Sequence, residues 1–150
     1  MKTKHLPVWL LLIAIIPVLS FTTKNKAQDY RIAIGIAYGN MACNGLTVKT
    51  ALGYEYKTAK GGSISEMSSQ VRADVANGHS INANDVVMKT GYKPYAVIIS
   101  YKKKISGWGC EKTMYAAGFG NSLDDATNDA VGNMEARGAA YSVLREITVY

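Results

Sequence analysis

Histidine and cysteine are scarce in this chain of 150 residues, which contains two of each. His79 is the one histidine beyond the N-terminal segment, and no CxxC or HxxxH pairing is present. Zinc sites are built from such clusters, so a metal site is not expected. A nucleophile also needs a base within reach, and the position of His79 after a predicted helix favours a solvated loop residue. The sequence therefore predicts no metal, no cofactor and no recognisable catalytic constellation.

The chain also lacks an apolar run that would span a bilayer comfortably. The longest run, from Leu6 to Leu19, follows two lysines, whereas a membrane span takes about 20 apolar residues. This layout is typical of a secretory signal peptide. We expect residues 1–27 to be removed, with a cut after Ser20 or an uncleaved anchor as the alternatives. The remaining residues 28–150 are expected to be periplasmic or extracellular, with no stable membrane span after cleavage.

An excess of one charge disappears with that segment. The full chain has a net charge of +6, but four of its 17 basic residues precede Gln28 and none of its 11 acids does. The part that follows therefore carries 13 basic and 11 acidic residues. Such a balance gives no argument for a polyanionic partner, so nucleic-acid binding is not expected.

The two cysteines are Cys43 and Cys110. In an oxidising compartment the simplest expectation is one disulfide between them. A disulfide that closes a loop of about 68 residues restricts the unfolded chain by about 4 kcal/mol in the entropy model. Two free buried thiols are the alternative.

Alternation of apolar and polar residues predicts strands along most of the chain. Leu46–Lys57 is the clearest, with Val48 and Tyr54 on one side and Lys49 on the other. The remaining predicted strands are Arg31–Tyr38, a weak one near Asp85–Lys89, a hairpin of Tyr95–Lys103 and Trp108–Gly118, and Ala140–Tyr150.

Two helices are predicted, over Ser63–Asn77 and Ser122–Arg137, and each begins with a serine followed three residues later by an acid. Their apolar positions match at an offset of 59 residues and fall on one helix face: Ile64, Met67, Val71 and Val75 against Leu123, Ala126, Ala130 and Met134. The match indicates a tandem duplication, with pseudo-repeats around 46–78 and 106–138. Coincidence is the alternative.

These elements predict a single domain of the α+β class. We expect the order β-β-α-β-β-β-α-β, with an antiparallel sheet and both helices packed on one face of it.

The stretch Tyr115–Ala130 contains a strand, a glycine, Ser122 and then alanines at Ala126 and Ala130. It resembles the strand-G-x-S-x-x-x-A-x-x-x-A-helix unit of a secreted bacterial domain family of unknown function. That family carries two such units behind an alternating Ile-Ala strand, a place that Arg31–Ala37 would fill here. The resemblance implies the fold but no activity. The same helix start also resembles the last helix of double-stranded-RNA-binding domains, but Asp124 and its neighbour stand where lysines would grip phosphates.

One region combines exposed charge with aromatic residues. Lys102, Lys103 and Lys104 form the strongest charge run, with Tyr101 before it and Trp108 just beyond. Aromatic residues beside cations are typical of recognition surfaces. A solvated hairpin tip and a buried Trp108 are the alternatives.

We therefore predict a small exported binding module of the inhibitor, immunity or envelope-adaptor type. It would act through contact with a protein partner that the sequence does not identify. One alternative is a hydrolase of an envelope or extracellular polymer that uses unidentified carboxylates. The other is a structural envelope protein that assembles with copies of itself through a free sheet edge. The acids available to a hydrolase lie mostly on helix faces: Glu66, Asp74, Asp124, Asp125, Asp129 and Glu135.

Overall fold

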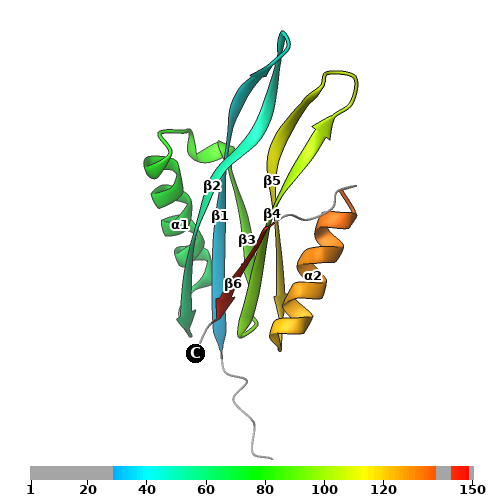
Figure 1. Ribbon diagram of the computed structural model, residues 1–150. Helices are drawn as coiled ribbons and strands as arrows, with labels where there is room; N and C mark the ends of the chain where they lie inside the picture. Colours follow the sequence, from blue (N-terminus) through cyan, green and yellow to red (C-terminus); the bar gives the residue numbers. More distant parts are fainter. Residues whose placement is uncertain (1–28, 138–142, 149–150) are drawn as a thin grey trace, which may run out of the picture.

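The computed structural model describes residues 29–137 and 143–148. The predicted signal peptide, residues 1–27, lies outside the described residues, as do the ends of the last predicted strand. The elements are, in chain order, β1 (Tyr30–Cys43), β2 (Leu46–Lys60), α1 (Ile64–Gly78), the 3-10 turn η1 (Ala83–Asp85), β3 (Val86–Gly91), β4 (Tyr95–Ile105), β5 (Cys110–Gly120), α2 (Leu123–Glu135) and β6 (Val143–Thr148). The α+β class and the order β-β-α-β-β-β-α-β are confirmed (Figure 1).

The chain forms two units of the same topology. The first unit has an antiparallel sheet of order β2-β1-β3 with α1, and the second has an antiparallel sheet of order β5-β4-β6 with α2. Each unit is therefore strand-strand-helix-strand, with its first strand in the middle of its sheet. The repeated structure extends beyond the pseudo-repeats at 46–78 and 106–138, because each unit also contains one strand before and one strand after its predicted repeat segment.

The structure has two sheets where one was expected, and the helices lie on their outer faces (Figure 1). The inner faces meet in a core of Ile32, Ile34, Ile36 and Ala51 from the first sheet and Ala96, Ile98 and Ala117 from the second. The outer face of β1 packs against α1, and the outer face of β4 packs against α2. Both central strands are thus buried on both faces, a situation in which alternation does not reveal how many sheets there are.

Each helix begins at the serine that the sequence indicated. Ser63 Oγ accepts a hydrogen bond from the backbone N–H of Glu66 at 3.3 Å, and Ser122 Oγ accepts one from the N–H of Asp125 at 3.1 Å. Such caps satisfy N–H groups that have no partner inside the helix. Among the described helices, none has the length and apolar character needed to cross a membrane.

Two hairpins extend together beyond the ends of the helices (Figure 1). The β1–β2 hairpin turns at Asn44 and Gly45, whose φ angles of 46° and 89° are those of a two-residue turn with left-handed residues. This turn suits the twist of paired strands, and Asn-Gly is its preferred sequence. The β4–β5 hairpin turns through residues 106–109.

The outer edge of β5 is closed by side chains. Four residues of this strand bond their outward-facing backbone groups to side chains: Thr113 N to Thr50 Oγ1 at 3.0 Å, Tyr115 O to Arg137 Nη1 at 3.1 Å, Ala117 O to Asn133 Nδ2 at 3.2 Å and Phe119 N to Asp129 Oδ2 at 2.8 Å. The last three partners lie four residues apart, on one stripe of α2 and its C-terminal end. Side chains therefore occupy at least one outward-facing backbone group at each of these four residues, which hinders pairing of this edge with another strand.

Candidate binding surface at the hairpin tips

A disulfide joins the tips of the two hairpins. Cys43 ends β1 and Cys110 begins β5, and their Cα atoms lie 6.1 Å apart across a sequence separation of 67 residues. The predicted pairing is confirmed. Asn44 Nδ2 adds a second link by donating to the carbonyl of Trp108 at 2.5 Å. The two tips, one from each unit, are thereby held together.

The turn of the second hairpin exposes a tryptophan. Gly107 and Gly109 flank Trp108, and both have φ angles in the left-handed region, 78° and 66°. Glycine tolerates this backbone conformation, which other residues rarely adopt. The N–H of Trp108 donates to the carbonyl of Ile105 at 3.2 Å, and the side chain remains 41% exposed. A large aromatic side chain is thus presented at a tip that the disulfide constrains.

The three lysines do not act as one patch, because successive residues of a strand point to opposite faces. Lys102 and Lys104 are exposed on one face of β4, where Lys102 Nζ donates to Thr113 Oγ1 at 2.7 Å. Lys104 lies opposite Glu111 in the register of the hairpin. Lys103 points the other way, is half-buried and donates to the carbonyl of Arg137 at 2.6 Å.

Tyr101 does not belong to the exposed surface that Trp108, Lys102 and Lys104 form. Its side chain is 0% exposed and packs with the α2 residues Ala130 and Met134 in the outer core of the second unit. Its hydroxyl group is buried, and no described residue forms a hydrogen bond with it. Alternation along β4 placed Tyr101 near the tip but did not show that α2 covers this end of the strand.

Tyr38 lies close enough to Tyr101 for the two phenols to interact electrostatically. Burial raises the pKa of Tyr38 above its usual value. The neighbouring Tyr101 acts in the same direction, and the Arg137 guanidinium opposes both. Tyr38 belongs to the first unit and the other two residues to the second, so this cluster lies at the junction of the units.

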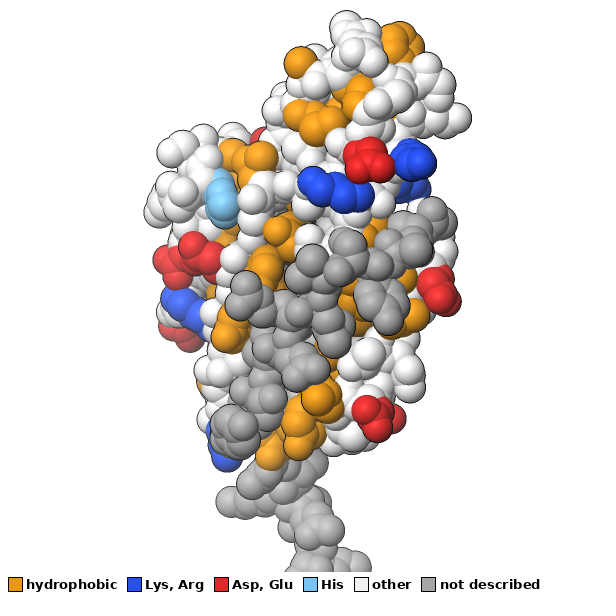
Figure 2. All heavy atoms as spheres, viewed as in Figure 1, with side chains coloured by type: hydrophobic (Ala, Val, Ile, Leu, Met, Phe, Trp, Pro, Cys, Tyr) orange, Lys and Arg blue, Asp and Glu red, His pale blue; other side chains and the backbone are white. Residues whose placement is uncertain are grey.

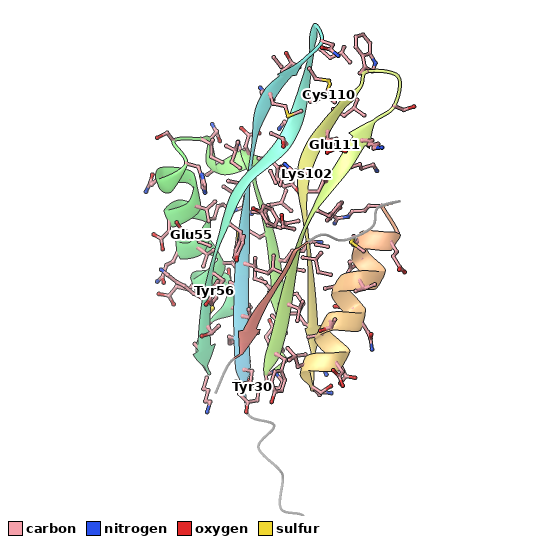
Figure 3. All side chains as sticks on the ribbon, in the orientation of Figure 1. Tyr30, Glu55, Tyr56, Lys102, Cys110 and Glu111 are labelled. Atoms are coloured by element: carbon pink, nitrogen blue, oxygen red, sulfur yellow. A yellow bond between two sulfur atoms is a disulfide. The ribbon has the colours of Figure 1, made fainter. Side chains whose placement is uncertain are left out.

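A groove lies at the turn of the second hairpin. Its volume is about 640 Å³. Its lining residues are Lys104, Ile105, Ser106, Gly107, Gly109, Cys110 and Glu111. Figure 3 labels Lys102, Cys110 and Glu111 on this part of the molecule. Figure 2 shows basic and acidic side chains close together near the base of the hairpins.

The sequence prediction included Lys102, Lys104 and Trp108 but missed two residues of this surface. Asn44 links the two turns through its side chain, and Glu111 provides a carboxylate opposite Lys104. The dipeptide Asn44-Gly45 between two alternating segments is a strong hairpin signal and could have located the first tip. No local signal places that tip beside Trp108.

Several acids considered for hydrolysis have structural contacts. Asp74 forms an ion pair with Lys57 at 2.7 Å, and Asp129 accepts from β5 as described above. Asp124 and Asp125 lie in the first turn of α2, where negative charge favours the helix dipole. His79 packs over Gly53, where an added Cβ would lie 2.6 Å from its ring. Across residues 29–137 and β6, no group of three or more His, Cys, Asp or Glu residues could hold a metal ion.

The fold and the surface together define a small disulfide-linked α+β domain made of two strand-strand-helix-strand units. No family model, curated protein or solved structure matches the chain.

Proposed function

We propose that this protein is an exported binding module whose hairpin tips contact a protein partner. The observation that carries the proposal is Trp108, exposed at a turn that the disulfide and Asn44 hold in place. Tryptophan is enriched among the residues that contribute most to protein–protein affinity. A contact group that is already ordered also loses less entropy on binding.

Charge around the tip suggests the chemistry of the partner. Lys102 and Lys104 are exposed on one face of β4, with Glu111 as the neighbouring acid. A partner surface with an apolar pocket and acidic residues at its rim would complement this arrangement. Periplasmic or extracellular location is part of the proposal, and the disulfide supports it because such bonds persist in oxidising compartments.

The test is affinity capture with the tagged, oxidised protein from the envelope and secreted fraction of the producing cell. We expect a stoichiometric protein that Trp108→Ala fails to capture and that binds the variant about 30-fold more weakly when purified. Tyr92→Ala is the matched control, because Tyr92 is also an exposed aromatic residue (57%) but lies beside Arg31 near the start of β1.

Charge reversal provides a second variant. Lys102→Glu with Lys104→Glu should slow association and reduce its dependence on salt, without changing the circular dichroism spectrum. Equal capture by the wild type and by both hairpin variants would show that the tips are not the binding surface.

A further inference from the structure

The outer edge of β2 differs from that of β5. Both are edge strands of their sheets, and β2 is the longer, with 15 residues. Gly61 N donates to Asp29 O at 2.6 Å, so this pair faces inward. Along an antiparallel edge strand, the backbone N–H and C=O groups of successive residues point alternately toward the neighbouring strand and away from it. The backbone groups of Tyr56, Thr58 and Lys60 therefore point outward. In the described part of the chain, no side chain bonds to them as Asp129, Asn133 and Arg137 bond to β5.

In the part of the chain that the structure describes, the helix of the first unit does not bond to this edge. α1 packs over β1, where Val71 and Val75 approach Gly35. Its residues at the positions of Asp129 and Asn133, after the offset of 59, are Gln70 and Asp74. Asp74 binds the Lys57 side chain instead of the strand backbone. A groove of about 380 Å³ remains between β2 and the start of α1, lined by Lys57, Thr58, Ala59, Gly61, Gly62, Ser63, Glu66, Met67 and Gln70.

The charged side chains along this edge would complement those of a second, identical copy of the strand. Tyr56 lies between Glu55 and Lys57, and it is 47% exposed although it is a large aromatic residue. If a second β2 pairs antiparallel with Tyr56 opposite Tyr56, each Glu55 lies opposite a Lys57 of the other copy. The Tyr56 pair would exchange hydrogen bonds, and the Glu55–Lys57 pairs would fall at the closer, non-hydrogen-bonded positions.

We propose that two copies of this chain pair antiparallel through β2, with the twofold axis at Tyr56, and so form a dimer with a continuous sheet. Figure 3 labels Glu55 and Tyr56 on β2, beside α1. The same surface serves both copies, so the contact closes at two and does not propagate. This surface is distinct from the hairpin tips, and the proposal does not depend on the proposed function.

The test is sedimentation velocity on the oxidised protein purified after export from the full chain. We expect a concentration-dependent dimer for the wild type. Glu55→Lys places two pairs of lysines opposite each other, and Lys57→Glu places two pairs of acids there. Each variant alone should associate about tenfold more weakly or worse.

Four further samples separate this register from a general loss of fold. The variant with both changes should dimerise as the wild type does, and an equal mixture of the two single variants should form a heterodimer. Glu135→Lys, the same charge change on an exposed part of α2, should leave the dimer unchanged. Tyr56→Cys should form a covalent dimer under oxidising conditions, because hydrogen-bonded cross-strand Cα atoms lie about 5.5 Å apart.

A wild type that stays monomeric at its highest soluble concentration would overturn the proposal. A dimer that both single variants leave unchanged, with no heterodimer preference and no Tyr56→Cys crosslink, would overturn it as well. Trp108→Ala should still dimerise, so failure at the hairpin tips and failure at β2 are distinguishable.

Discussion

The two units have the same topology, but their helices sit on different strands. In the first unit the small residues facing the helix are on the central strand β1: Ala33, Gly35 and Ala37. In the second unit they are on the edge strand β5, namely Ala116, Gly118 and Gly120, whereas the central strand β4 presents Val97, Ile99 and Tyr101. Each helix approaches the strand with the smaller side chains, so residue size decides where the helix lies in a shared topology.

The position of the helix then decides the state of the sheet edge. Because α2 lies over β5, its polar stripe reaches the backbone of that strand and closes the edge. Because α1 lies over β1, no side chain of the described residues bonds to the edge of β2 between Tyr56 and Lys60. The same fold thus gives one protected edge and one edge suited to pairing.

The largest expected effect on the free energy of unfolding comes from removing the disulfide that links the two units. Replacing Cys43 and Cys110 together by alanine should lower the free energy of unfolding by about 4 kcal/mol, because the unfolded chain regains the entropy of a long closed loop. Urea denaturation of this variant and of the oxidised wild type measures the difference. A loss below about 1 kcal/mol would contradict the view that the disulfide fixes the units together.

One glycine from each helix–strand contact, Gly118 and Gly35, should differ in its tolerance of a methyl group. A Cβ at Gly118 would lie 2.1 Å from the backbone nitrogen of Ala130, so Gly118→Ala should cost about 3 kcal/mol. At Gly35 the nearest atoms belong to the side chains of Val75 and Val71, at 2.9 and 3.0 Å, and these can shift. Gly35→Ala should therefore cost only about 1 kcal/mol.

Thermal and urea unfolding of these two variants provide the comparison. Gly132→Ala is a matched control, since an added Cβ there meets nothing within 4 Å. If Gly35→Ala proved the more damaging of the two, the tight contact would belong to the first unit and the comparison would be reversed.

The smallest expected effect lies at the junction of the units and depends on pH. Burial raises the pKa of Tyr38, so the folded protein holds this phenol neutral to a higher pH than the unfolded chain does. Its contribution to stability is complete below the unfolded pKa of about 10 and is lost as pH rises through the folded value.

Unfolding free energies of the wild type and Tyr38→Phe, measured from pH 8 to 11, test this expectation. The difference between the two proteins should be constant at the lower pH values and should shift against the wild type above about pH 10. A difference independent of pH would show that Tyr38 is not held neutral by its surroundings.

The sequence predicted most elements because their signals are local. Helix starts at Ser63 and Ser122 follow from the pairing of a capping serine with an acid three residues on, and both caps are present. The disulfide followed from the presence of two cysteines and an expected oxidising compartment. The exposed position of Trp108 was one of two alternatives, and the glycines around it favour a turn.

Other features depend on which surfaces meet. Tyr101 was expected near the binding surface, but α2 buries it. Lys103 was grouped with its neighbours, yet it turns toward Arg137. The sequence contains these residues but does not state which helix covers them.

What the sequence by itself determined is the set of elements, their order and the repeat, because turns, caps and periodicity are properties of neighbouring residues. The partner of each cysteine followed from the presence of two cysteines in the sequence. Only the tertiary structure decided that the strands form two sheets, that each helix lies on an outer face and that side chains of the described residues bond to the outer edge of β5 but not to that of β2 at Tyr56, Thr58 and Lys60. The physical reason is that these outcomes depend on the fit of small residues, such as Gly35 and Gly118, against helices that are distant in the chain.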